Sequence, residues 1–141
     1  MEGLSLFADG ELFAVDVTLV EKVVRNITYT PIHAAPETVA GIANMKGGIV
    51  TLLSLSELLG RGRSAEAVNA VVFKPFTSGN DQMGLLVNQP DELITIDDDM
   101  IVPPHLSGND EEESFISGLA EVGERLYRII DVDLIMKQFR Y

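Results

Sequence analysis

The stretch that decides the fold reads Gly41-Ile42-Ala43-Asn44-Met45-Lys46-Gly47-Gly48-Ile49-Val50-Thr51-Leu52-Leu53-Ser54-Leu55. Residues 39–44 are predicted to be extended, and Lys46-Gly47-Gly48 predicts a turn. Residues 49–55 predict a strongly apolar strand, and residues 56–60 predict one helical turn that ends at glycine. The stretch therefore predicts a β-hairpin that leads into a short helix.

The same pattern returns near the end of the chain. A shift of 77 residues aligns residues 41–59 with residues 118–136 without a gap. Besides the identical pairs Gly41/Gly118 and Ala43/Ala120, eight pairs are apolar: Ile42/Leu119, Met45/Val122, Ile49/Leu126, Leu52/Ile129, Leu53/Ile130, Leu55/Val132, Leu58/Ile135 and Leu59/Met136. A shift of 70 residues brings Ala14-Val15 onto Gly84-Leu85, Val17 onto Val87, and Val23-Val24 onto Leu93-Ile94.

This correspondence predicts two halves with one plan, although two apolar hairpins could also match by coincidence. Each half, of roughly 65 to 75 residues, would be only marginally stable alone, so the two should share a hydrophobic interface. The sequence therefore predicts two small β-barrels with a groove between them.

The remaining elements follow from turn signals and alternation. The chain opens with a predicted hairpin of residues 4–8 and 11–17 around Asp9-Gly10. Residues 19–25 fit either a strand or a single helical turn that leads into one. The other predicted elements are strands at 67–76 and 82–88 around a turn at 77–81, a break at Pro90-Asp91-Glu92, an extended piece at 93–96, a long acidic loop at 97–114, an extended piece from 116, a turn at Gly123-Glu124, a strand at 126–132 and a helical tail from about Asp133.

Residues 60–66 are the best candidate for a linker. They contain Gly60-x-Gly62-x-x-Ala65, a loose version of the dinucleotide-binding fingerprint. That motif needs a long helix after the glycines, whereas the residues that follow predict a strand. A mobile connector is the expected role.

Length and charge exclude several classes of function. A chain of 141 residues fits a single domain. Ten Lys and Arg against 22 Asp and Glu give a formal net charge of −12. No Lys or Arg lies between Lys74 and Arg125, so this stretch carries the whole imbalance. Binding to nucleic acid or to an anionic membrane surface is therefore disfavoured.

The sequence contains no arrangement typical of an enzyme or of a metal site. It has no cysteine, and neither His33 nor His105 belongs to a metal-ligand spacing. Asp97-Asp98-Asp99 is expected to be a solvated loop rather than a cation site. The serines lack a nucleophile elbow. We therefore expect no catalytic residue, no cofactor and no metal. The start of the chain has no secretion signal and no apolar run spans a bilayer, so a cytoplasmic location is expected.

The deciding stretch resembles the central signature of CheW-like domains, the chemotaxis coupling proteins, in which it usually reads Gly-Val-Ile-Asn-Leu-Arg-Gly before an apolar strand. Further segments resemble the family in the same order along the chain: 12–17 and 20–24 its opening strands, Pro31-Ile32 with Ala35-Pro36 its proline-containing connector, and 84–87 with 118–131 its second half. The resemblance covers nearly the whole chain.

The resemblance implies a mainly β fold of two SH3-like five-stranded barrels packed together, with short helices and a C-terminal helix. Residues 1–141 would be a single CheW-like domain of two interleaved subdomains. Members of the family are non-enzymatic adaptors that bridge the cytoplasmic tips of chemoreceptors to the histidine kinase CheA, with a receptor helix hairpin in or near the groove between the barrels.

The resemblance also implies the partner-binding residues. Val20 matches a kinase-facing position, and Asn44, Met45 and Lys46 match the signature turn that supports receptor coupling. Lys22 and Val87 complete the implied set. Lys46 departs from the usual arginine and so loses the bidentate fork, and Lys22 stands where an acidic residue is frequent. Two other functions stay open: a coupler for a kinase array outside chemotaxis, and a sensor that binds a small ligand in the cleft between the barrels.

Overall fold

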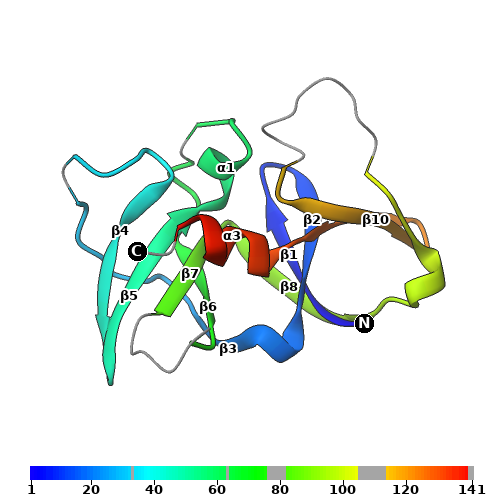
Figure 1. Ribbon diagram of the computed structural model, residues 1–141, viewed down its shortest axis with the longest axis horizontal. Helices are drawn as coiled ribbons and strands as arrows, with labels where there is room; N and C mark the ends of the chain where they lie inside the picture. The colour runs from blue at the N-terminus through cyan, green and yellow to red at the C-terminus, as the bar shows by residue number, and fades with distance from the viewer. Residues whose placement is uncertain (33, 63, 76–81, 105–113, 140–141) are drawn as a thin grey trace.

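The structure is a computed structural model that describes residues 1–32, 34–62, 64–75, 82–104 and 114–139. Two β-sheets lie side by side, and the C-terminal helix lies between them in this view (Figure 1). His33, His105, the predicted turn at 77–81 and the residues 105–113 of the predicted acidic loop lie outside the described residues.

Each sheet is assembled from antiparallel neighbours and one parallel pair. The six-stranded sheet has the order β8 (Gln89–Thr95), β1 (Glu2–Ala8), β2 (Glu11–Asp16), β11 (Arg125–Ile130), β10 (Ile116–Val122) and β9 (Ile101–Val102). The five-stranded sheet has the order β3 (Val20–Val24), β6 (Asn69–Phe73), β7 (Gln82–Val87), β5 (Gly48–Ser54) and β4 (Val39–Met45). The mainly β fold is confirmed, although one sheet has six strands where the resemblance implies five.

The two sheets follow one pairing plan, as the sequence correspondence predicts. Adding 77 to both members of each pair between β4 and β5 reproduces each pair between β10 and β11, from Val39↔Leu53 and Ile116↔Ile130 onward. The parallel pairs also coincide, since Leu52↔Gly84 becomes Ile129↔Ala14 when 77 is added to one member and 70 is subtracted from the other. We call positions related by these two shifts equivalent.

Three buried clusters hold the sheets together. One lies with the five-stranded sheet and includes Leu52 and Leu86, and another lies with the six-stranded sheet and includes Ala14 and Tyr127. The largest cluster takes buried side chains from both sheets, among them Leu6, Phe13, Phe73 and Leu85. The predicted interface between the halves is therefore present, as a buried cluster to which both sheets contribute side chains.

The two short helices begin at equivalent residues. α1 (Leu55–Leu58) has Ser54 as its N-cap, and the Ser54 hydroxyl accepts the Glu57 N–H at 3.2 Å. α3 (Val132–Gln138) has Asp131 as its N-cap, whose carboxylate accepts the Leu134 N–H at 3.0 Å. Ser and Asp both satisfy a free N–H at a helix start, so the sequence difference between the halves preserves the cap. Both helices add leucine, isoleucine or valine side chains to the largest cluster.

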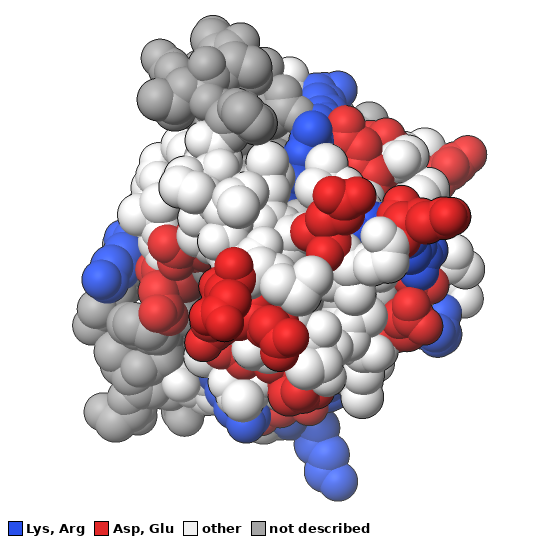
Figure 2. Space-filling view, turned by 90° about the vertical axis from the view of Figure 1, so that its right-hand side faces the viewer, with Lys and Arg blue, Asp and Glu red and all other residues white. Residues whose placement is uncertain are grey.

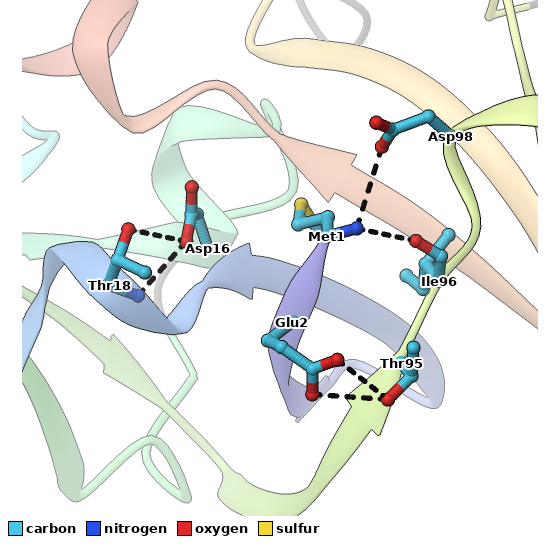
Figure 3. Close-up of polar contacts among 7 residues, drawn as sticks. All are labelled: Met1, Glu2, Asp16, Thr18, Thr95, Ile96 and Asp98. Carbon is cyan, nitrogen blue, oxygen red and sulfur yellow. Dashed lines mark hydrogen bonds and ion pairs between the residues drawn. The ribbon is translucent and has the colours of Figure 1, made fainter.

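The chain crosses from one sheet to the other at two short segments. η1 (Val17–Leu19) follows β2 and leads into β3, so both alternatives left open for residues 19–25 are realised in succession. The Asp16 carboxylate caps η1 by accepting the Thr18 N–H at 2.9 Å (Figure 3). The chain crosses back at Asn88, which lies between β7 of the five-stranded sheet and β8 of the six-stranded sheet. Residues 60–66 instead connect α1 to β6, and the strands on either side of this segment, β5 and β6, belong to the same sheet.

The predicted break at Pro90-Asp91-Glu92 is wrong, because these residues lie inside β8. β8 is the first strand in the order of its sheet, and proline is tolerated where a strand has a neighbour on one side only. The ladder between β1 and β8 shifts its register at Ser5, whose hydroxyl accepts the Glu92 N–H at 2.9 Å. The Thr95 hydroxyl donates to the Glu2 carboxylate at 2.8 Å, which ties the far end of β8 to β1 (Figure 3).

The acidic segment is not one loop over its whole length. Asp98 begins η2 (Asp98–Met100), and β9 follows and pairs with β10. The prediction failed here because a two-residue strand is too short to show alternation. The Met1 ammonium donates to the Ile96 carbonyl at 2.6 Å and lies 3.5 Å from the Asp98 carboxylate, so the beginning of β1 holds the beginning of this segment (Figure 3).

Two equivalent glycines allow a neighbouring strand to approach closely. A Cβ atom at Gly41 would lie 2.3 Å from the Thr30 carbonyl oxygen, and one at Gly118 would lie 2.6 Å from a methyl carbon of Ile101. Thr30 forms an isolated bridge with Ile42, at the place where β9 pairs with β10 in the other sheet. The identity of this glycine pair in the sequence therefore has a steric cause.

We expect Gly41→Ala to lower the free energy of unfolding by about 2–4 kcal/mol, because backbone atoms must move to admit the methyl group. Gly47→Ala is the control: its φ of 102° is strained for alanine, but no atom lies within 4 Å of the added carbon. The control should lose about 1 kcal/mol. Urea denaturation midpoints measure both, and an equal loss in the two variants would contradict the steric argument.

Candidate partner-binding surface

The residues implied by the resemblance lie on two edges of the five-stranded sheet. Val20 and Lys22 are half-buried on β3, which is one edge strand. Asn44 and Lys46 are exposed and Met45 is half-buried at the hairpin between β4 and β5, which includes the other edge strand. These two groups of residues lie on opposite edge strands of the sheet. They can form one surface only if the sheet curls so that its two edges approach each other.

In the six-stranded sheet, the end that is equivalent to the end with the Lys46 turn is strongly curled. Arg125 at the start of β11 contacts the carboxylates of Asp91 and Glu92 in β8 at 3.1 Å each, although two strands separate β8 from β11. In the five-stranded sheet, the positions equivalent to Glu92 and Arg125 are Lys22 and Gly48. Because the strand registers are the same, this equivalence places Lys22 near the turn that carries Lys46.

A side-chain bridge crosses the same end of the five-stranded sheet. The Gln82 amide donates to the Glu21 carboxylate at 2.6 Å and to the Phe73 carbonyl at 3.2 Å. Gln82 is also the ladder partner of Val50, the second residue after the turn glycine pair. The bridge therefore connects β3 to the strand that follows the signature turn.

The charges at the two equivalent ends differ. Arg125 is ion-paired, and its pKa is raised, first by charge interaction with Tyr127 and then with Asp91. Among the residues that the structure describes, no carboxylate lies within 4 Å of the Lys22 or Lys46 ammonium group. The five-stranded end therefore presents cationic groups that can meet an anionic partner.

Two apolar side chains accompany these cations, and the resemblance did not imply them. Ile49 is 54% exposed beside the turn, and Val23 is 37% exposed on β3. Ile49 alternates with Val50 and Leu52, which are buried in the cluster of this sheet. The burial pattern of β5 places Ile49 on the outer face, whereas the sequence shows only an apolar run here. We define the candidate surface as Lys22, Val23, Met45, Lys46 and Ile49.

Val87 does not belong to the candidate surface. Its side chain is 0% exposed and lies in the largest cluster, at the end of β7. A partner cannot reach it while the seam is intact, so the assignment of Val87 as a contact residue is corrected. The burial explains why an apolar residue is required there, since β7 lies between two strands and has both faces covered.

Comparison with known proteins identifies a consistent set of relatives. The sequence model of the CheW-like domain matches residues 2–140. The chain is 30% identical over 131 residues to the chemotaxis protein CheW of Helicobacter pylori, covering 91% of this chain and 76% of that protein. It is 23% identical over 137 residues to the chemotaxis protein CheW of Thermotoga maritima, covering 97% and 88%. The crystal structure of the scaffolding protein TtCheW from Thermoanaerobacter tengcongensis superimposes with a TM-score of 0.78 at 26% identity, covering 92% and 82%.

Substitution should separate the buried residue from the exposed one. We expect Val87→Ala to lower the free energy of unfolding by about 1–3 kcal/mol, because it leaves a cavity in the shared cluster. Ile49→Ser removes a mostly exposed side chain and should change stability by about 0.5 kcal/mol or less. Thermal and urea denaturation measure both. A larger loss for Ile49→Ser than for Val87→Ala would show that the assignment of core and surface is reversed.

Proposed function

Because the chain belongs to the CheW-like domain family, we propose that it is a non-enzymatic adaptor in the cytoplasm that couples chemoreceptor tips to a CheA-type histidine kinase. The relatives are named as chemotaxis proteins, and the matching crystal structure is that of a scaffolding protein. The match over residues 2–140 is the observation that carries the proposal. None of the helices in the described part of the chain has the length and apolar character needed to cross a membrane.

The fold supports a mechanism based on assembly geometry. The largest cluster joins both sheets, so the surfaces on the two sheets are held at a fixed distance and angle. A close-packed core has low compressibility, and a partner bound to one sheet is thereby positioned relative to a partner bound to the other. We propose on the same grounds that residues 1–141 act as one domain of two interleaved subdomains.

The candidate surface is the proposed receptor contact. Its exposed apolar side chains, Ile49 and Val23, can pack on the apolar stripe of a helix, and Lys46 can fix the register of that helix. A coupler in a kinase array outside chemotaxis would use the same surface, and genomic neighbours would distinguish the two settings.

We expect Lys46→Glu to leave the fold intact and to weaken binding to a receptor-tip fragment about tenfold, because an exposed turn residue has no structural contact to lose. Co-sedimentation with receptor fragments and a CheA-type kinase measures the effect, and the melting temperature tests the fold. Lys46→Arg keeps the charge and is the matched control. Unchanged receptor binding by Lys46→Glu would reject the role of this turn, and failure of the unmodified chain to join either partner would reject the coupling function.

A further inference from the structure

The end of the five-stranded sheet lacks the ion pair that closes the equivalent end of the other sheet. There, Arg125 contacts Asp91 and Glu92 at 3.1 Å each. Here, a cation, Lys22, takes the place of Glu92, and Gly48, which has no side chain, takes the place of Arg125. The backbone positions are equivalent, yet within the described residues Lys22 has no carboxylate within ion-pair distance.

The acidic residue on β3, Glu21, is equivalent to Asp91 but forms no ion pair with Lys22 or Lys46 within the described residues. The Glu21 carboxylate accepts a hydrogen bond from the neutral Gln82 amide at 2.6 Å. Within the described ranges, the ammonium groups of Lys22 and Lys46 both lack a carboxylate within 4 Å. Close to these two lysines in the sequence lie two exposed apolar side chains, Val23 and Ile49.

The six-stranded side has the opposite character. No Lys or Arg occurs between Lys74 and Arg125, and this sheet and its connections carry Asp97, Asp99, Glu121 and Glu124. Figure 2 faces this side of the molecule and shows acidic side chains spread over it. An anionic partner is repelled there and is favoured at the five-stranded end, so the charge distribution orients the partner before contact.

We infer that the candidate surface selects a receptor-tip helix whose apolar stripe is bordered by Asp or Glu side chains, with Lys22 and Lys46 as its specificity-determining residues. The inference rests on the proposed function and adds the chemistry of the partner. The apolar side chains of Val23 and Ile49 bury the stripe, and the two ammonium groups pair with the flanking carboxylates. The observation that favours an acidic partner over a basic or neutral one is that Lys22 and Lys46 form no ion pair within the described residues.

The test measures binding of a receptor-tip fragment, from the same genome as this chain, by titration calorimetry at several salt concentrations. We expect Lys22→Glu to weaken binding about tenfold and Lys22→Gln about threefold, and the double variant Lys22→Glu/Lys46→Glu to bind more weakly than either single variant. Added salt should weaken binding of the unmodified chain and should have the opposite effect on the double variant, in which attraction has become repulsion.

Lys137→Glu is the matched control, because it makes the same charge change at an exposed position on α3. Melting temperatures show whether each variant is folded. If the unmodified chain binds the fragment and Lys22→Glu binds no worse than Lys137→Glu, the inference is overturned and the coupling function stands. Tighter binding by Lys22→Glu would show that the partner is basic and would also overturn it. No binding by the unmodified chain would remove the proposed receptor contact and the inference with it.

Discussion

The shared apolar seam is the constraint on which the rest of the structure depends. Each sheet covers one of its faces with its own small cluster, and the opposite faces of β1, β2, β6 and β7 meet in the largest cluster. The shared cluster adds buried apolar surface to both halves, and a unit of roughly 70 residues would be only marginally stable without it. The chain crosses between the sheets at η1 and at Asn88, so the six-stranded sheet combines β1 and β2 from the start of the chain with β8 to β11 from its end.

The two sheets share the same backbone pairing, but the side chains at their equivalent ends differ. The register shift between Val39 and Gly41 recurs between Ile116 and Gly118, so even an irregularity of the ladder is common to both sheets. The side chains at the open ends have diverged instead. One end is closed by Arg125 with two carboxylates, and the other presents two lysines and exposed apolar groups. A scaffold that holds different partners requires this difference, because two identical surfaces could not discriminate between them.

Sequence reasoning succeeded where a local pattern has a single physical solution. The glycines after Lys46 and the strongly apolar run after them define the central hairpin, and the shift of 77 residues finds its copy. It failed at Pro90, because the tolerance of proline depends on being in an edge strand, and strand order is not a local property. The resemblance also implied Val87 as a partner contact, whereas its side chain is buried in the cluster that both sheets share, and burial of this kind is not visible in a local pattern.

By itself, the sequence determined the hairpins, the internal correspondence, the family resemblance and the segregation of negative charge, because each depends on residue types at short spacings or on composition. Only the tertiary structure decided that side chains of both sheets share one buried cluster, that Arg125 meets carboxylates two strands away, and that Lys22 and Lys46 form no ion pair within the described residues. These properties depend on contacts between residues far apart in the chain. Alternation shows which face a side chain takes, but only the packed fold shows what lies opposite that face.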